Sequence, residues 1–167
     1  PHRLWDLFTP EQLDAYGVAE DLWFYTSRGP HHLTKGYPQE YSMILIEDFE
    51  AKADGAIDGT NPNSADLRFG HDGDIMAFLP QMRMNGYDER LTDPDEISLK
   101  WSVALMSPMA ANLQLVFFRP KHKKATADNV LVLALMNEVP ATFPLEQAAP
   151  GLYRWSDLKK LFLTPLN

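Results

Sequence analysis

Two apolar stretches in the second half of the chain constrain its fold more than any other feature. The first is "LQLVFF" (113–118), and the second spans 129–136 and contains "VLVLALM", the longest purely apolar run in the sequence. Two strand-like runs joined by a polar loop predict a β-hairpin. Because both runs are almost continuously apolar, we expect these strands to be covered on both faces of a sheet. The intervening "RPKHKK" (119–124) is more simply a solvated hairpin loop than an anion-binding patch.

The first third of the chain predicts two helices. In "TPEQLDAYGVAEDLWFYTS" (9–27), Thr9 is a candidate N-cap, Pro10 suits the first helical position and Gln12 can complete a capping box. The segment "EYSMILIEDFEAKADGAID" (40–58) carries an apolar stripe at helical spacing. The stripe consists of Met43, Ile46, Phe49, Ala53 and Ile57.

A strand followed by a helix is predicted around "DLRFGHDGDIMAF" (66–78). The strand covers about 66–70, and the helix runs from about Asp74 to a left-handed cap at Asn85-Gly86. A kink or restart is expected at Pro80, because proline lacks the N–H that a helix interior needs.

The remaining segments complete the order of elements. Residues 87–98, "YDERLTDPDEIS", are expected to be a polar connection. The segment "RWSDLKKLFL" (154–163) predicts a short closing helix with Ser156 as its N-cap. The order is thus helix, helix, strand, helix, hairpin, helix, which predicts a mixed α and β chain with two helices before any strand.

The composition excludes several classes of protein. The chain has 167 residues, of which 45% are hydrophobic, and this suits one globular domain. It contains no cysteine, so disulfides and thiolate chemistry are excluded. A net charge of −8 argues against nucleic acid as a partner, because phosphate backbones bind clustered Lys and Arg. No apolar run approaches the roughly 18 residues of a membrane helix, so no membrane span is expected.

His71 and Asp72 lie where the predicted strand meets the predicted helix. A helix N-terminus has free N–H groups and a positive dipole end, which together favour an anion. His71 could donate a hydrogen bond to a phosphate oxygen, and Asp72 could give a proton to the oxygen of a leaving group. The competing interpretation is an ordinary turn, and the dipeptide by itself favours the turn.

Two other clusters have simpler interpretations. The adjacent histidines His31 and His32 suggest a metal site, but adjacent residues of a strand point to opposite faces and no third ligand is in obvious range. Because residues 28–38 are rich in Gly and Pro, the histidines fit a solvated loop better. Five aromatic residues near the N-terminus are expected in the core, namely Trp5, Phe8, Trp23, Phe24 and Tyr25.

The stretch "DLRFGHDGDIMAFL" (66–79) resembles the second catalytic motif of the histidine acid phosphatases, the branch of the histidine phosphatase superfamily that includes phytases and multiple inositol polyphosphate phosphatases. That motif is a strand, a small residue, His-Asp and a helix. Similar flanking segments extend the resemblance over nearly the whole chain. They are "LWDLFTPEQLDAYGVAEDLWFY" (4–25), "ILIEDFEAKADGAIDG" (44–59), "SPMAANLQLVFFR" (107–119) and "PGLYRWSDLKKLF" (150–162).

The resemblance implies an α/β fold, namely the C-terminal part of a phosphoglycerate mutase-like (histidine phosphatase) fold with a mixed sheet flanked by helices. Residues 1–167 would form the C-terminal portion of one such domain. In it, residues 1–60 would be mainly helical, and 65–167 would belong to the α/β core with the His-Asp motif and a C-terminal hairpin. Relatives of this kind are usually exported, so the resemblance implies a periplasmic or secreted protein.

The resemblance also implies a mechanism. In the family, the histidine of an R-H-G-x-R motif attacks phosphorus and becomes phosphohistidine, while arginines hold the phosphate oxygens. By position, His71 would contact the phosphate, and Asp72 would be the general acid that protonates the leaving oxygen and then helps to activate water. The family mechanism needs no metal and no other cofactor. The implied partner is a phosphorylated small molecule of the inositol phosphate type.

The chain departs from the family in one respect, because it contains no R-H-G triplet and "SRGPHH" (27–32) does not supply one. We therefore expect the C-terminal part of a longer enzyme, inactive alone, whose partner is the missing N-terminal part of the same domain. The start at Pro1 and a sheet with too few strands to cover its apolar faces favour this interpretation. Two alternatives stay open: a non-catalytic phosphate-binding or interaction module derived from this family, and an unrelated α/β domain in which His71-Asp72 is only a turn.

Overall fold

The computed structural model describes residues 3–166 as helices arranged around a small sheet. The helices are α1 (Pro10–Arg28), α2 (Tyr37–Asp58), α3 (Asp72–Gln81), α4 (Pro94–Lys100), α5 (Val103–Met106) and α6 (Trp155–Leu163), with short 3-10 turns η1 (Leu4–Leu7), η2 (His32–Thr34) and η3 (Met84–Gly86). The strands are β1 (Leu113–Phe118), β2 (Leu131–Met136), β3 (Val139–Pro140) and β4 (Tyr153–Arg154). The predicted mixture of α and β structure is confirmed.

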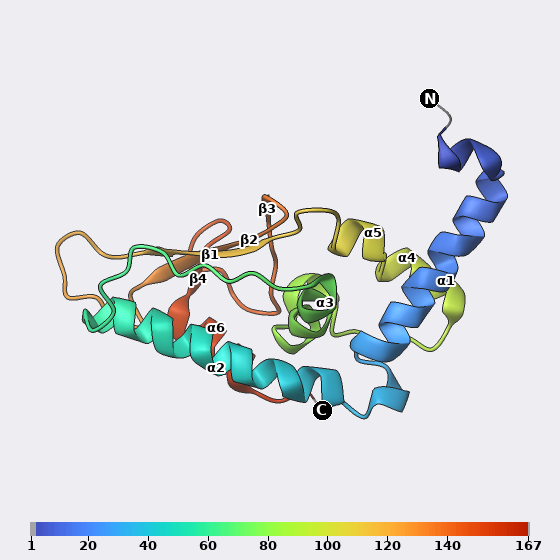
Figure 1. Ribbon diagram of the computed structural model, residues 1–167. Coiled ribbons are helices and arrows are strands. Elements are labelled where there is room, and N and C mark those ends of the chain that lie inside the picture. Colours follow the sequence, from blue (N-terminus) through green and yellow to red (C-terminus); the bar gives the residue numbers. More distant parts are fainter. Residues whose placement is uncertain (1–2, 167) are drawn as a thin grey trace.

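The long helix α2 runs below the sheet in Figure 1, and α6 lies on the same side. Helix α3 stands near one end of the sheet and packs against α2, while α1 and α4 extend beyond α3 towards the N-terminus. One continuous apolar core joins these parts. Its largest buried side chains include Trp101, Trp155, Tyr25 and Tyr153.

Strands β1 and β2 form the predicted hairpin. Leu115 lies opposite Ala134, and Phe117 lies opposite Val132. The basic residues 119–124 form its connecting loop and are mostly exposed, as predicted. Strands β3 and β4 also pair with β2, and every pairing within residues 3–166 is antiparallel, which corrects the expectation of a mixed sheet. Two parallel neighbours must be joined by a long crossover connection, whereas each described strand pairs with an antiparallel neighbour.

Only one face of the hairpin is covered, which corrects the expectation of cover on both faces. Val132 and Ala134 are buried on the side of the helices, and Phe117 on this side packs edge-on against Trp155. On the opposite face, Val116 and Phe118 are exposed. The burial alternates because successive strand residues point to opposite faces, and α2 and α6 both lie on one side (Figure 1).

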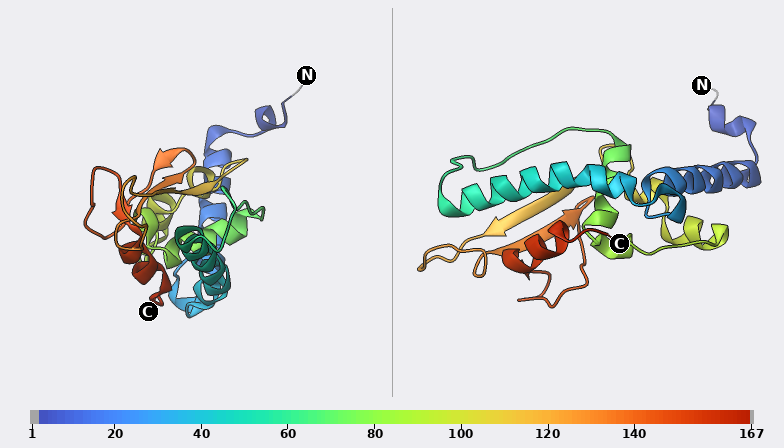
Figure 2. Two further views of the ribbon diagram at one scale, coloured as in Figure 1. Left: turned by 90° about the vertical axis from the view of Figure 1, so that its left-hand side faces the viewer. Right: turned by 90° about the horizontal axis from the view of Figure 1, so that it is seen from below.

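Helix α1 begins as predicted, with a capping box. The Thr9 hydroxyl accepts a hydrogen bond from the Gln12 N–H, and Gln12 Oε1 accepts one from the Thr9 N–H at 2.9 Å. The expected aromatic core is wrong for three of its five members. Trp5, Phe8 and Trp23 are exposed. Trp5 and Phe8 stay exposed because the N-terminal part projects away from the other elements (Figure 2). Trp23 is exposed although Tyr25, two residues further along α1, is fully buried.

Helix α2 buries the predicted apolar stripe, of which Ile46 and Ala53 are the most enclosed members. Polar side chains on α2 bind α6 through a hydrogen bond and an ion pair. Asp54 Oδ1 accepts a hydrogen bond from the buried indole N–H of Trp155 at 2.8 Å, and Asp54 Oδ2 pairs with Lys159 Nζ at 2.5 Å. The α6 helix begins at Trp155, so the predicted N-cap residue Ser156 lies inside its first turn.

Helix α3 is buried along its second half, where every residue from Met76 to Gln81 is enclosed. The helix starts at Asp72, earlier than predicted. Pro80 lies inside α3, which ends one residue later at Gln81, so the α-helix does not continue or restart beyond the proline. The left-handed backbone predicted at Asn85-Gly86 is present, but it does not cap the helix as expected, because α3 ends at Gln81 and Asn85 and Gly86 belong to η3.

The predicted strand at 66–70 is not formed. Residues 62–70 are all exposed and make no hydrogen bond to another part of the described main chain. Figure 1 shows this segment running back along α2, from the end of that helix to the start of α3. A strand requires a neighbouring strand for its main-chain groups, and β1 pairs only with β2 among the described strands.

The expected polar connection at 87–98 contains the start of helix α4. Asp93 caps this helix, since its Oδ1 accepts a hydrogen bond from the Asp95 N–H at 3.0 Å. Ile97 is its only buried residue, so the apolar pattern is too sparse to reveal a helix in the sequence. Within residues 3–166, no helix has both the length and the apolar character that crossing a membrane requires.

Candidate functional site

His71 occupies the N-cap position of α3, and Asp72 is the first residue of this ten-residue helix. The main-chain N–H of His71 donates a hydrogen bond to Asp74 Oδ2 at 3.0 Å. Asp72 Oδ1 accepts a hydrogen bond from the Gly73 N–H at 2.7 Å. The side chains of His71 and Asp72 are both exposed. The motif therefore lies on the surface, at the positive end of a helix whose body is buried.

The side chain of Arg28, the last residue of α1, reaches the first turn of α3. Gly73 leaves room for it, because a Cβ atom at this position would lie 3.4 Å from Arg28 Nε and 3.7 Å from Arg28 Cζ. The carbonyl oxygen of Arg28 accepts a hydrogen bond from Nε2 of Gln39 at 2.8 Å, and Gln39 is buried in α2. Three helices thus meet here: α1 brings a cation, α2 fixes the end of α1 and α3 presents the motif.

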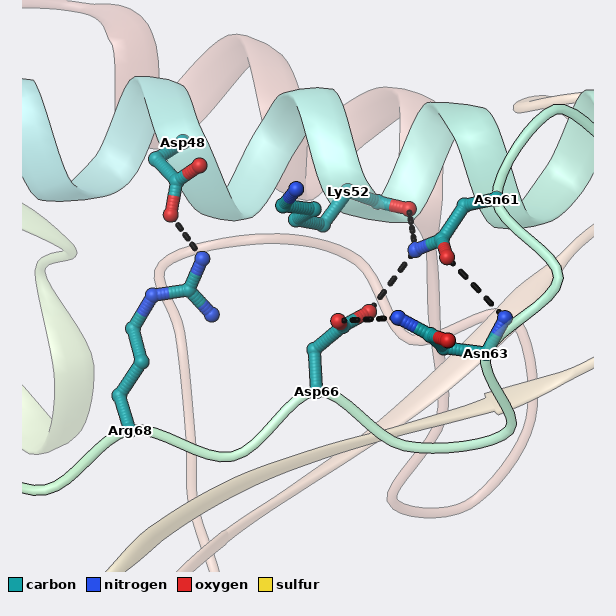
Figure 3. A network of polar contacts seen from close by, with 6 residues as sticks. All are labelled: Asp48, Lys52, Asn61, Asn63, Asp66 and Arg68. Atoms are coloured by element: carbon teal, nitrogen blue, oxygen red, sulfur yellow. Dashed lines mark hydrogen bonds and ion pairs between the residues drawn. The ribbon is translucent and has the colours of Figure 1, made fainter.

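Side chains fasten the segment that leads into the motif (Figure 3). The Asp66 carboxylate accepts hydrogen bonds from Nδ2 of Asn61 at 2.8 Å and from Nδ2 of Asn63 at 3.1 Å. These two bonds hold the pKa of the Asp66 carboxyl below its usual range. Two residues further on, Arg68 pairs with Asp48 of α2. The approach to the motif is therefore set by polar contacts rather than by strand pairing.

This arrangement is chemically suited to an anion. The positive end of the α3 dipole and the nearby Arg28 guanidinium both favour negative charge, and His71 adds an exposed ring that can donate a hydrogen bond. Asp72 adds a carboxyl group that can exchange a proton with a bound molecule. In the part of the chain that the structure describes, no group of three His, Asp or Glu side chains is placed to hold a metal ion.

The structure corrects the interpretation of His31 as a solvated residue. Its side chain is only 8% exposed, and its Nδ1 accepts a hydrogen bond from the Leu33 N–H at 3.3 Å. Burial, and secondarily the neighbouring His32, lowers the pKa of His31. The two imidazole rings lie 4.1 Å apart rather than on opposite faces, because the chain here enters the η2 turn instead of a strand. His31 is thus a structural residue of the connection between α1 and α2.

The tertiary structure adds Arg28 to the site, and no local pattern in the sequence points to it. Its place beside Gly73 follows from the packing of α1 against α3, which joins residues far apart in the chain. The geometry of Arg28, His71 and Asp72 is therefore the basis on which a function can be argued. No protein-family model matches the chain, and no curated protein matches it.

Proposed function

We propose that this chain is the C-terminal part of a histidine acid phosphatase-like enzyme, which hydrolyses phosphomonoesters of the inositol phosphate class. One observation carries the proposal: His71 and Asp72 begin the exposed N-terminus of α3, and the Arg28 side chain lies against Gly73, the next residue of that helix. The resemblance of residues 66–79 to the second motif of that family supports it. The phosphoglycerate mutase-like fold and a periplasmic or secreted location belong to the same proposal.

Each residue has a defined role in this proposal. The phosphate group binds at the start of α3, where His71 and main-chain N–H groups donate hydrogen bonds to its oxygens and Arg28 balances its charge. A histidine outside the chain attacks phosphorus, and the bond from phosphorus to the ester oxygen breaks. Asp72 gives its proton to that oxygen, so the product leaves as a neutral alcohol. Asp72 then takes a proton from the water that attacks phosphohistidine, the bond from phosphorus to the histidine nitrogen breaks, and inorganic phosphate is released with the histidine restored.

A second candidate function is a non-catalytic phosphate-binding or interaction module. The exposure of both His71 and Asp72 favours it, because a catalytic group usually acts where water is excluded. The two candidates share phosphate binding and differ in turnover. Hydrolysis of a phosphomonoester by the full-length protein would select the enzyme, and phosphate binding without hydrolysis would select the module.

Phosphate binding can be tested on the chain itself. We expect titration of the ¹⁵N-labelled protein with inorganic phosphate to shift the amide signals of residues 71–74 and the Nε–H signal of Arg28. The Arg28→Gln variant should bind phosphate about tenfold more weakly or worse, because a charge-assisted hydrogen bond contributes about 1.5–3 kcal/mol.

Arg90→Gln is the matched control for this titration. Arg90 is also an exposed arginine, and its replacement removes the same charge from the protein. We expect the Arg90→Gln variant to bind phosphate like the unchanged protein. Equal weakening in both variants would mean that only the overall charge matters. If phosphate shifts other amide signals but not those of residues 71–74, phosphate does not bind at the start of α3.

A further inference from the structure

The segment that joins α2 to α3 runs along the outside of the molecule. Residues 61–71 belong to no helix or strand, and every residue from 62 to 70 is exposed. The main chain of residues 62–70 makes no hydrogen bond to another main-chain group within residues 3–166. Figure 2 shows the segment beside α2, at the outer edge of the molecule. Its N–H and C=O groups are therefore accessible to another molecule along the whole stretch.

Side chains attach this segment to α2 at two positions and leave its apolar residues free. Asp66 and Arg68 make their polar contacts on the side of α2, as Figure 3 shows. The exposed fractions of Leu67 and Phe69 are 77% and 95%. Exposed ion pairs such as that of Arg68 contribute little to stability, so the segment can leave α2 at a small cost.

An accessible, extended main chain with an exposed aromatic side chain is what a serine endoproteinase binds. Extended peptides are bound through main-chain hydrogen bonds, and the side chain before the cut bond fills a specificity pocket. In proteinases of chymotrypsin-like specificity, this pocket is an apolar slot. A helix cannot be bound in this way unless its internal hydrogen bonds break first.

Phe69 differs from the other exposed aromatic residues in its main chain. Within residues 3–166, every other exposed aromatic residue belongs to a helix, a strand or a hydrogen-bonded turn. Phe69 alone lies on a stretch whose main chain is accessible and unpaired. The bond that follows Phe69 is therefore the one that such an enzyme can reach without unfolding a helix or a strand.

This bond lies just outside the hydrogen-bonded start of α3. The Asp74 N–H donates a hydrogen bond to the His71 carbonyl oxygen at 3.1 Å, and the His71 N–H donates one to Asp74 Oδ2 at 3.0 Å. Both bonds join residues that follow Gly70. A cut before Gly70 therefore leaves the start of α3 intact.

The two parts of the chain on either side of this bond share one core. The Tyr25 hydroxyl donates a hydrogen bond to the Glu89 carbonyl oxygen at 3.1 Å and accepts one from the Leu91 N–H at 2.6 Å. Asp54 accepts the indole hydrogen bond of Trp155. The fully buried ring of Tyr25 belongs to the same apolar cluster as the buried residues of α3, β2 and α6. These contacts do not pass through the segment, so they survive a cut within it.

We propose that the Phe69–Gly70 peptide bond is a cleavage site for a serine endoproteinase of chymotrypsin-like specificity, and that the cut chain keeps its fold. The reaction is hydrolysis: the C–N bond breaks, Phe69 gains a terminal carboxylate from water and Gly70 gains a terminal amino group. Arg28 and His71 would then lie on different pieces, held together only by non-covalent contacts. The inference rests on the segment and the core, and it does not depend on the proposed phosphatase function.

The test is brief digestion of the whole 167-residue chain with a small amount of chymotrypsin, followed by mass spectrometry of the intact products. We expect the first products to be residues 1–69 and 70–167 in equal amounts. The two pieces should persist, elute together in size-exclusion chromatography and keep the helix content of the uncut chain in circular dichroism. A chain that had to unfold before cleavage would instead expose all its aromatic residues and give many small peptides.

A matched pair of variants separates the accessible main chain from mere exposure of a side chain. Phe69→Ser and Tyr41→Ser each remove an exposed aromatic ring, but Tyr41 lies within helix α2. We expect Phe69→Ser to slow the cut after position 69 at least about tenfold, because serine leaves the apolar pocket of the enzyme unfilled. Tyr41→Ser should be cut at the rate of the unchanged chain. Circular dichroism of both uncut variants should be unchanged, since both positions are exposed.

Several results would overturn the inference. Resistance of the chain to chymotrypsin, a first cut after Tyr41, or equal slowing in both variants would exclude the segment as the preferred site. Pieces that separate or lose their helix content would exclude a fold that survives the cut. The digestion reports on residues 66–70, whereas the phosphate titration reports on residues 71–74 and Arg28, so the failure of either proposal can be recognised separately.

Discussion

At the scale of single residues, the sequence predicts that the His-Asp dipeptide lies at the start of a helix, and the structure has it there. His71 caps a helix and Asp72 opens its first turn, which is also what an ordinary turn of Asp and Gly residues would do. The position of Arg28 is compatible with the proposed anion site, because a guanidinium against Gly73 adds positive charge to a helix end that already favours anions. Chemistry at Asp72 is the part of the proposal that a single substitution can test.

In the full-length protein, Asp72→Asn is expected to slow the hydrolysis of alkyl phosphates by about 100-fold or more, since general acids contribute at least that much. Hydrolysis of p-nitrophenyl phosphate should slow far less, because its leaving group departs without a proton. The measurement is kcat/KM for both esters. Asp74→Asn, which removes a carboxylate two residues away, should affect both esters equally. An equal decrease of kcat/KM for both esters in Asp72→Asn would contradict the assignment of Asp72 as the general acid.

At the scale of elements, the contact between α2 and α6 depends on a small polar cluster at the edge of the core. Lys159 of α6 pairs with Glu50 and Asp54 of α2, and Asp54 also accepts the indole hydrogen bond of Trp155. Burial alone would raise the pKa of the Asp54 carboxyl, but the hydrogen bonds from Lys159 and Trp155 outweigh it and hold that pKa below its usual range. The same pairing raises the pKa of Lys159.

Replacing Asp54 should change stability in a pH-dependent way. A carboxyl group whose pKa is lower in the folded state stabilises the fold above its unfolded pKa, and this contribution disappears as the pH falls through the folded value. At pH 7, Asp54→Asn is therefore expected to lower the free energy of unfolding by about 1 kcal/mol. The difference from the unchanged protein should shrink below about pH 4.

Urea unfolding across this pH range measures the effect. Asp128→Asn is the control, because Asp128 is an exposed carboxylate of the hairpin loop, and we expect little change in stability from it. A difference between Asp54→Asn and the unchanged protein that stays constant from pH 7 to pH 3 would contradict the assignment to the ionised carboxylate.

At the scale of the whole molecule, the sheet of residues 3–166 has one exposed apolar face, and β1 pairs with β2 alone. Leu67, Phe69, Val116 and Phe118 expose apolar surface where a wider sheet would bury it. The proposed catalytic apparatus is also incomplete, since a phosphohistidine mechanism needs a nucleophilic histidine and the chain has no R-H-G triplet.

The purified 167-residue chain alone is expected to show no turnover of p-nitrophenyl phosphate above the buffer blank, because its sequence has no R-H-G triplet to supply the attacking histidine of the proposed mechanism. A phosphatase assay with high protein concentration and long incubation measures this. Turnover that co-elutes with the chain through two chromatographic steps, and that is lost in Asp72→Asn, would contradict the expectation and place the whole activity within these residues.

The sequence by itself determined the structures that depend on neighbouring residues. The capping box of Thr9, the buried stripe of α2, the hairpin and the left-handed turn at Asn85-Gly86 all follow from short patterns, because their hydrogen bonds and periodicity are local. The position of His71-Asp72 at a helix start belongs to the same group.

Only the tertiary structure decided what depends on distant partners. It left residues 66–70 unpaired, buried His31, exposed Trp5 and brought Arg28 to Gly73. The physical reason is the same in each case. A strand needs another strand to receive its main-chain hydrogen bonds, and a side chain is buried only where another element packs over it. The few residues around a position predict neither its strand partner nor the element that packs over it.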